Sequence, residues 1–407
     1  MNARIDPDFS DKSASHEARL RAEVAAWMAA HLTGEFACLR YRGGPGDEDA
    51  FPALRKAWER ELAAGGWTGL GWPVEAGGRG WSIADQVIFH EEYARAGGPG
   101  RMGHIGEGLL GPTLIACGNA DQRARFLPGI LAGTQFWCQG YSEPGAGSDL
   151  ANVRTRAERQ PDGAWRIDGQ KVWTSLAHDS EWIFVLARSD PQSRGNKGLS
   201  FLLVPLDQPG VEIRPIRQMN GGAEFNEVFF DGARAEAADL VGEPGNGWRI
   251  AMTLLGFERG ISTLGQQMQF IRELDWVIEA AREAGVADDP AIRARIAKAW
   301  AGLRTMRYNA LRMLAGAGNN ASAAPDKSSL IYKYYWSNWH RDLGQLAMDV
   351  LGERANLVDA NDQKRSRLQG VFLFSRADTL YAGTNEIQLN IMAERGLGMP
   401  KEPRGQA

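Results

Sequence analysis

The chain has 407 residues, of which 43% are hydrophobic and 24% are charged. This composition is typical of a globular protein, and at roughly 150 residues per domain the length predicts two or three domains. The formal net charge of only −4 disfavours electrostatic capture of nucleic acid or of an anionic membrane surface. The expected partners are therefore small molecules or other proteins, with no nucleic acid and no membrane.

The cysteines and the N-terminal residues indicate in which cellular compartment the protein is expected. Cys38, Cys117 and Cys138 are widely spaced and fit neither a disulfide framework nor a zinc site, so we expect reduced core residues and no bound metal. The N-terminal stretch lacks the apolar region of a secretion signal, and no run approaches the ~20 apolar residues of a membrane span. The sequence therefore predicts a soluble, cytoplasmic protein.

Residues 15–132 carry apolar side chains at helical spacing. Helices are expected over SHEARLRAEVAAWMAAHL, FPALRKAWERELAAGG and SIADQVIFHEEYARAGG. In the third of these, Ser82 and Asp85 form a capping-box-like start and two glycines end the helix. A shorter helix, NADQRARFLPGILAG, is expected to kink or end near Pro128.

From about residue 137 to 240 the periodicity becomes that of β-strands. Short strand-like segments alternate with Gly, Pro, Asn and Asp breaks; they are VRTRAERQ, AWRIDGQKVWTS, EWIFVLARS, GLSFLLVPL, VEIRPI and NEVFFDG. Strands of this length and spacing predict a small barrel or sandwich.

After Gly247 the helical pattern returns for the rest of the chain. One helix is expected over 248–285, a second begins at Asp289-Pro290, and a third spans roughly 326–352. The prediction is an α+β multidomain chain. Its domains are an N-terminal α-helical domain (1–135), a middle β domain (136–245) and a C-terminal helical domain (246–407).

The segment FWCQGYSEPGAGSDL, residues 136–150, lies where the first helical region meets the β region. Gly145, Gly147 and Ser148 bring backbone N–H groups and a hydroxyl together without bulky side chains, which suits a polyanionic cofactor. On this pattern alone a plain loop is the commoner outcome. The segment matches neither the Rossmann nor the P-loop motif.

Two other segments combine residue types that carry chemistry. In GQKVWTS, Trp173 could stack on a flat ring, and Thr174 or Ser175 could donate a hydrogen bond to a ring heteroatom. An ordinary alternating strand is the simpler interpretation. In LLGFERGIS, Glu258 next to Arg259 interrupts an apolar stretch, and a carboxylate in such surroundings can act as a general base. A buried ion pair or a solvated helix face explains the same residues at least as well.

Together these segments resemble one family, the acyl-CoA dehydrogenases. The resemblance is carried, in the family's order and spacing, by SEPGAGSD, GQKVWTS, FNEVFFDGARA with LVGEPGNGW, GFERG and YAGTNEIQLNIMAERGLG. With GWPVEAGGRG and GHIGEGLLGPTL these motifs cover nearly the whole chain. The resemblance implies an N-terminal helical domain, a central β-barrel and a C-terminal four-helix-bundle-like domain that assembles the oligomer.

The resemblance also implies FAD as cofactor. Ser142 matches the residue that bonds the pyrimidine end of the flavin, and Gln139 belongs to the same cofactor site. Gly147 and Ser148 match the loop that approaches the FAD pyrophosphate, and Ser148 also approaches the acyl-CoA.

Four further positions are assigned to FAD by the same resemblance. Trp173 lies beside the isoalloxazine ring, and Ser175 contacts flavin N5. Thr384 and Glu386 contact the diphosphate and adenosine region. A helix N-terminus suits that place because its unpaired N–H groups and dipole favour an anion.

The implied reaction is α,β-dehydrogenation of an acyl-CoA thioester to the trans-2-enoyl-CoA, with electrons leaving to an electron-transfer flavoprotein. Many members carry the catalytic glutamate directly after the tyrosine of the C-terminal motif, where this chain has Ala382. A branch for branched or long acyl chains carries the base on the helix after the barrel, which Glu258 matches. The Ala382 backbone N–H keeps its role of donating to the thioester carbonyl, and Arg259 lies near the substrate CoA.

The segment AAREAGVADDP departs from the family's Arg-x-x-Phe-Gly motif, which contacts the FAD of the neighbouring subunit. Similar divergence occurs in heterotetrameric members, so we expect a homo-tetramer or dimer, or a heterotetramer with a related subunit. The alternative functions are a flavin monooxygenase or oxidase of the same fold, and a non-catalytic partner subunit. A DNA-associated flavoprotein of this fold is disfavoured by the net negative charge. A displaced base fits a bulky or branched acyl chain, such as a steroid side chain, and the expected pathway is β-oxidation of a fatty acid or of a steroid side chain.

Overall fold

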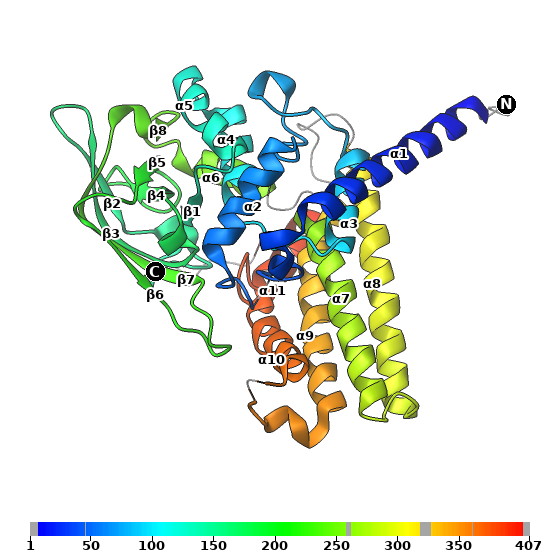
Figure 1. Cartoon of the computed structure of the whole chain (residues 1–407). Coiled ribbons are helices and arrows are strands. Elements are labelled where there is room, and N and C mark those ends of the chain that lie inside the picture. The colour runs from blue at the N-terminus through cyan, green and yellow to red at the C-terminus, as the bar shows by residue number, and fades with distance from the viewer. Residues whose placement is uncertain (1–6, 45, 258–261, 318–326, 360, 402–407) are drawn as a thin grey trace. The chain divides into compact units, whose positions relative to one another are not determined.

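A computed structural model describes residues 7–44, 46–257, 262–317, 327–359 and 361–401 (Figure 1). Contacts between residues divide the chain into two compact units, Met1–Ser262 and Thr263–Ala407. The order of elements is helices, then strands, then helices, so the predicted α, β, α architecture is confirmed. The domain boundaries drawn from the sequence stay predictions.

The helices of the first unit are α1 (Pro7–His31), α2 (Pro52–Ala64), α3 (Ile83–Arg95), α4 (Gly111–Cys117), α5 (Ala120–Leu131) and α6 (Gly247–Phe257). Of these, α2, α3 and α5 begin and end close to the predicted bounds, whereas α1 begins earlier than expected and α4 was not predicted as a separate helix. The predicted cap of α3 is present, since Ser82 Oγ accepts the Asp85 N–H at 3.2 Å. α5 continues past Pro128 to Leu131. Cys38 is exposed, so the prediction that all three cysteines are core residues is wrong for Cys38.

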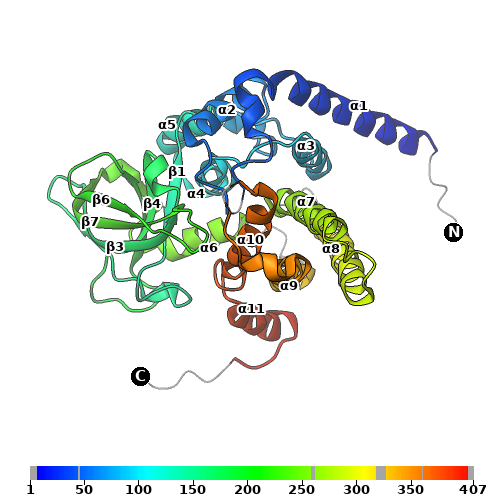
Figure 2. The same cartoon turned by 60° about the horizontal axis from the view of Figure 1, so that its bottom comes forward.

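The β region is one eight-stranded sheet (Figure 2). Its strands are β1 (Trp137–Gly140), β2 (Arg156–Arg159), β3 (Trp165–Ser175), β4 (Trp182–Arg188), β5 (Leu199–Pro205), β6 (Val211–Pro215), β7 (Phe225–Ala235) and β8 (Leu240–Val241). The hydrogen-bonded order is β6-β7-β3-β2-β4-β5-β8, and β1 pairs in parallel with β4. β1 therefore lies inside the segment for which a loop was the commoner expectation.

Strands β4 and β5 are buried on both faces, which places the core of this unit around them. Alternate side chains of a strand point to opposite faces. On one face, Phe184 and Phe201 pack in a cluster with side chains of α4, α5 and α6. On the other, Val185 and Leu202 pack with Val228 of β7, so the sheet curls over its own interior.

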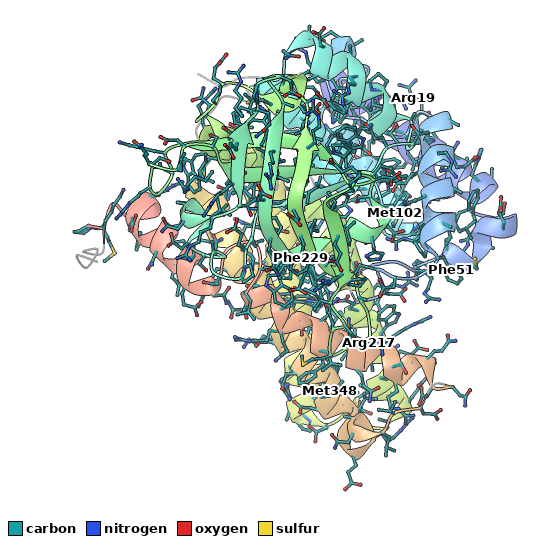
Figure 3. All side chains as sticks on the ribbon, turned by 90° about the vertical axis from the view of Figure 1, so that its left-hand side faces the viewer. Arg19, Phe51, Met102, Arg217, Phe229 and Met348 are labelled. Atoms are coloured by element: carbon teal, nitrogen blue, oxygen red, sulfur yellow. The ribbon has the colours of Figure 1, made fainter. Side chains whose placement is uncertain are left out.

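The outer face of the sheet is partly polar. Figure 3 looks onto the sheet with Phe229 of β7 labelled. The guanidinium of Arg214 lies 4.5 Å from the centroid of the Phe229 ring and covers part of it. The neighbouring Val228 and Phe230 are buried on the opposite face, as strand alternation requires.

The second unit is helical. Its helices are α7 (Ser262–Glu283), α8 (Pro290–Ala317), α9 (Tyr332–Leu351), α10 (Gln363–Ser375) and α11 (Asn385–Ile391). α7, α8 and α9 run side by side (Figures 1 and 2). Asp289 caps α8 as predicted, because its Oδ1 accepts the N–H groups of Ala291 and Ile292.

Two helix predictions in this region need adjustment. The helix expected over 248–285 is seen as α6 and α7 on either side of residues 258–261, which lie outside the described residues. The helix expected from 326 begins at Tyr332, because Lys327–Ile331 form a 3₁₀ turn first. No helix among the described residues is both long and apolar enough to cross a membrane.

The stacked aromatic pair at the centre of the first unit gives a stability prediction. The Phe184 and Phe201 rings stack with centroids 5.5 Å apart, and both are fully buried. Phe184→Ala should lower the free energy of unfolding by about 3–5 kcal/mol, measured by denaturant titration. The control Met219→Ala, at a residue that is 75% exposed, should change it by less than about 0.5 kcal/mol. Equal effects of the two substitutions would contradict this placement of the core.

Candidate functional site

A β-bulge near the end of β3 presents Trp173. Lys171 pairs with Val228 and Thr174 pairs with Asn226, so β3 carries one more residue than β7 between these pairs. Trp173 sits in the bulge with φ +60° and a side chain that is 58% exposed, although both its neighbours are buried. A bulky residue at positive φ costs about 1–3 kcal/mol and persists only where the surroundings enforce it. The bulge thus favours the functional interpretation of GQKVWTS over an ordinary strand.

The residues after the bulge are held by their neighbours. The Asn226 side chain donates to the carbonyl of Thr174 at 3.0 Å. Leu176, also at positive φ (56°), is buried against Met102 and Phe136 (Met102 is labelled in Figure 3). The segment that follows Trp173 is therefore held in place by its neighbours.

The glycine-rich loop forms a tight turn with open space beside it. Glu143 and Ala146 exchange two backbone hydrogen bonds, of 3.1 and 3.0 Å. A Cβ atom added to Gly145 or Gly147 would meet nothing within 4 Å, and Gly147 and Ser148 are exposed. A ligand can therefore approach the backbone here, as the cofactor interpretation requires.

A buried ammonium fastens this loop to β3. Lys171 is fully buried, and its Nζ donates to Glu143 Oε1 (2.8 Å) and to the carbonyls of Tyr141 (3.0 Å) and Leu186 (2.8 Å). Burial lowers the pKa of Lys171 to about 8, and the Glu143 carboxylate opposes that shift. The ammonium is thus still protonated at neutral pH, and three oxygens replace its hydration.

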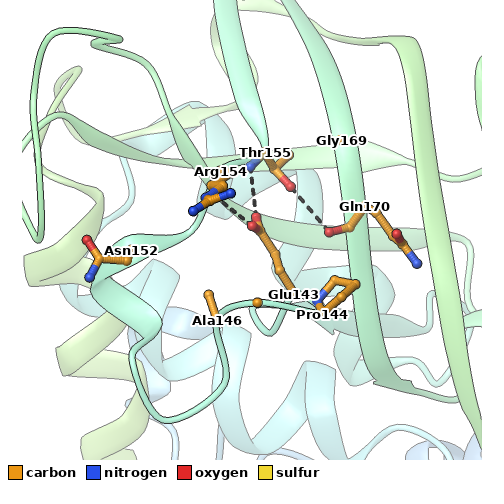
Figure 4. A pocket seen from close by; sticks show the side chains of 9 residues that line it. Glu143, Pro144, Ala146, Asn152, Arg154, Thr155, Gly169 and Gln170 are labelled. Atoms are coloured by element: carbon orange, nitrogen blue, oxygen red, sulfur yellow. Dashed lines mark hydrogen bonds between the residues drawn. The ribbon is translucent and has the colours of Figure 1, made fainter.

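The Glu143 carboxylate anchors the other side of the loop (Figure 4). It accepts the N–H groups of Arg154 (2.6 Å) and Thr155 (2.8 Å) in addition to the Lys171 ammonium. Burial acts to raise the pKa of Glu143, but the positive charge of Lys171 and these donors lower it overall. The sequence interpretation missed this pair, although SEPGAGSD contains the acidic residues Glu143 and Asp149 and GQKVWTS contains one basic residue, Lys171.

The pair brings predicted site residues together. The carbonyl of Ser142 accepts the Val172 N–H at 2.9 Å, which places Ser142 beside the Trp173 bulge. Ser175 lies two residues further along β3, opposite Phe225, and Gln139 is half-buried on β1. Glu258 and Arg259 lie outside the described residues.

A small pocket of about 210 Å³ opens beside the loop (Figure 4). It is lined by Glu143, Pro144, Gly145, Ala146, Asn152, Arg154, Thr155, Gly169 and Gln170. Pockets for drug-sized ligands measure roughly 300–1,000 Å³, so this pocket is too small for a dinucleotide. It can receive at most one polar portion of such a molecule.

The remaining predicted residues lie in the C-terminal unit. Ala382 is exposed at φ +51°, and its N–H has no hydrogen-bond partner among the described residues. Its carbonyl accepts the side-chain amide of Gln388 at 3.3 Å. Thr384 Oγ1 caps α11 by accepting the Ile387 N–H, and Glu386 is exposed in the first turn of that helix. That these residues share one cofactor site with Trp173 stays a prediction.

Comparison with known proteins establishes the class. Models of the acyl-CoA dehydrogenase N-terminal, middle and C-terminal domains match residues 14–134, 138–233 and 245–397. The chain therefore belongs to the acyl-CoA dehydrogenase family and is an oxidoreductase of that family, whose members are generally flavin-dependent. The resemblance carried by the motifs is confirmed, and so is the fold it implied.

Among named relatives, acyl-CoA dehydrogenase IpdE1 of Mycobacterium tuberculosis is 56% identical over 385 residues, covering 95% of this chain and 98% of the relative. The solved structure "Tcur3481-Tcur3483 steroid ACAD" has a TM-score of 0.82 and 30% identity, and the match covers 99% of this chain and 100% of that chain. The ChsE4-ChsE5 complex from Mycobacterium tuberculosis has a TM-score of 0.79 and 28% identity, covering 99% and 100%.

Removing the buried Lys171 ammonium should destabilise the fold. Lys171→Met leaves the Glu143 carboxylate buried without its cation, which should lower the free energy of unfolding by about 3–5 kcal/mol in denaturant titration. Adding Glu143→Gln to Lys171→Met should recover part of the loss, because no uncompensated charge then remains.

The control for this prediction is Glu212→Gln, which breaks the exposed pair between Glu212 and Arg214 in the same unit. Exposed pairs contribute about 0–1 kcal/mol, so this variant should be close to wild type. The assigned role of Lys171 would be refuted by a Lys171→Met variant as stable as Glu212→Gln.

Proposed function

We propose that this protein catalyses FAD-dependent α,β-dehydrogenation of an acyl-CoA thioester to the trans-2-enoyl-CoA and passes the electrons to an electron-transfer flavoprotein. The observation that carries the proposal is Trp173, an exposed aromatic residue held at positive φ beside an open glycine loop. A flat ring bound there would gain stacking, and the loop would meet its phosphates.

The residues present fit FAD. Trp173 offers an aromatic face, Ser142 and Ser175 offer hydroxyl groups near it, and Gly147 leaves the backbone accessible. Further contacts are proposed from Gln139, Ser148, Thr384 and Glu386. When bound, FAD supplies the hydride acceptor.

The base is proposed to be Glu258. Ala382 has no group that can take a proton, so the α-proton needs a carboxylate from elsewhere, and GFERG supplies one next to apolar residues. Arg259 is proposed to contact the CoA part of the substrate.

The thioester oxygen needs hydrogen-bond donors as negative charge develops during removal of the α-proton. The Ala382 N–H suits this role, because no described residue accepts its hydrogen bond and its backbone is fixed at φ +51°. The proposal thus assigns proton removal to the Glu258 side chain and oxygen stabilisation to the Ala382 backbone.

A bulky acyl group is the proposed substrate class, because a solved relative of 30% identity is titled a steroid ACAD. A second candidate function is that of a subunit in a heteromeric enzyme. It is favoured by the divergent segment AAREAGVADDP and by the match to the ChsE4-ChsE5 complex.

Anaerobic flavin bleaching tests the reaction and the base together. The purified protein is mixed with linear, branched and steroid-side-chain acyl-CoAs; a bulky thioester should bleach the flavin fastest. Glu258→Gln should slow bleaching by at least 100-fold, as expected when a general base is lost.

The control is Glu243→Gln, which alters an exposed acid outside the proposed site and should match wild type. Equal bleaching rates in wild type and Glu258→Gln would show that the base is another group. If the chain binds flavin only after co-expression with a related subunit, the second candidate function is the correct one.

Cofactor affinity tests the role of Trp173. Stacking of a base on an aromatic side chain contributes about 1–3 kcal/mol, so Trp173→Ala should weaken FAD binding by roughly 5- to 150-fold in fluorescence titration. Trp173→Phe should lose less.

Phe51→Ala is the matched control. Phe51 is also an exposed aromatic residue at positive φ, with 42% exposure and φ +50°, and it lies in the same unit. The proposed stacking role would be excluded if Trp173→Ala and Phe51→Ala bound FAD equally well.

A further inference from the structure

A buried ionic network lies in the C-terminal unit, and none of its members has been assigned a role above. His340 of α9 donates from Nδ1 to Asp378 Oδ2 (2.5 Å) and from Nε2 to Glu273 Oε2 of α7 (2.6 Å). All three side chains are buried. Because each ring nitrogen faces a carboxylate oxygen, both nitrogens carry protons and the ring is an imidazolium.

The two carboxylates stabilise that charge. Burial acts to lower the pKa of His340, but Glu273 and Asp378 raise it to about 10. A buried ion cluster is seldom the most stabilising way to fill a core, since apolar side chains of similar volume often do as well. What distinguishes such a cluster from apolar packing is that its charge-assisted hydrogen bonds are directional and fix each partner at a defined distance and angle.

One arm of the network leads to the turn that carries Ala382. The second oxygen of Asp378 accepts the Tyr381 hydroxyl at 2.6 Å, and the Asp378 carbonyl accepts the Lys333 ammonium. Lys333 Nζ also lies 5.3 Å from the centroid of the Tyr381 ring. Tyr381, directly before Ala382, is thus held by its hydroxyl and over its ring face.

The far end of the turn is tied to α9 as well. Ser337 Oγ donates to Asn385 Oδ1 at 2.9 Å, and both residues are buried. Between these attachments Ala382 keeps φ +51°, which costs an L-residue about 1–2 kcal/mol. A strained residue relaxes unless both of its flanks are held, and here both are held by α9.

We infer that His340 is a positioning residue: clamped between Glu273 and Asp378, it holds the turn Asp378–Thr384 in the strained conformation that presents the Ala382 N–H. The inference rests on the donor role proposed for Ala382. His340 acts through Asp378 and Tyr381 and touches neither the substrate nor the cofactor in this role.

The test compares wild-type holoenzyme with His340→Gln, which keeps hydrogen-bonding capacity but removes the charge. Amide hydrogen exchange in a peptide covering 378–386 should be at least tenfold faster in His340→Gln, with peptides from α8 unchanged. The limiting rate of flavin reduction should fall at least tenfold while KM changes less than threefold, since the donor acts mainly in the transition state.

Lys364→Gln is the control. It breaks exposed ion pairs from α10 to Glu279 and Glu283 of α7, in the same unit, and should leave both readouts at wild-type values. If His340→Gln does not fold, Glu273→Gln replaces it and should show a smaller change in the same direction. Wild-type exchange of 378–386 in a folded variant overturns the inference.

The bleaching and hydrogen-exchange measurements distinguish failure of the proposed function from failure of the inference about His340. If no acyl-CoA bleaches the wild-type flavin, the proposed function fails, yet hydrogen exchange still decides whether His340 holds the turn. If bleaching occurs and His340→Gln lowers only the unfolding midpoint, His340 is merely stabilising and the inference falls.

The pH dependence gives an independent check. Among the described residues, the titratable and charged groups that act on His340 and its two carboxylates include Glu273, Asp378, Tyr381, Lys333 and Arg376, which interacts electrostatically with Asp378. The folded pKa of about 10 lies above the ordinary 6.5, so the stabilising contribution is complete below pH 6.5 and is lost as pH rises to 10. The difference in unfolding midpoint between wild type and His340→Gln should therefore narrow from pH 7 to 10. A constant difference would mean that the imidazolium charge is not what holds the turn.

Discussion

The buried contact between Lys171 and Glu143 is the interaction on which the first unit's site depends. It joins residues 28 positions apart and connects β3, the glycine loop and, through the Leu186 carbonyl, β4. An apolar pair could fill the same space, but it would not orient the loop against the strand. Because the carboxylate also accepts two backbone N–H groups, the loop is tied to the chain on both sides of Glu143 and lies beside the Trp173 bulge.

The same physical device occurs in both units. In each, an L-residue at positive φ stands next to a buried ionic group: Trp173 near Lys171 and Glu143, and Ala382 near Asp378 and its partners. Strained backbone needs directional restraints, which charge-assisted hydrogen bonds supply better than apolar packing. Each unit thus combines a strained presenting residue with charges that only hold it.

The fold class could be predicted from sequence because hydrophobic periodicity is a local signal. The strand β1 could not, since its four residues depend on parallel pairing with β4 far along the chain. The site residues likewise fall into those that local motifs predict and those that depend on contacts between distant parts of the sequence. Family motifs pointed to Trp173 and Ala382, whereas His340 was missed because its meaning depends on Glu273, 67 positions away.

Ala382 illustrates why residues that fix the backbone conformation of a turn are important for the proposed site. A side-chain base depends on what the residue is, but a backbone donor depends only on the local conformation, which α9 and the turn fix from outside. The side-chain base and the backbone donor, which many family members are expected to place together at this position, can therefore be supplied by different residues. A carboxylate can move to another helix, as proposed for Glu258, while the N–H donor stays in place, provided that the charges around Asp378 keep the strained turn from relaxing.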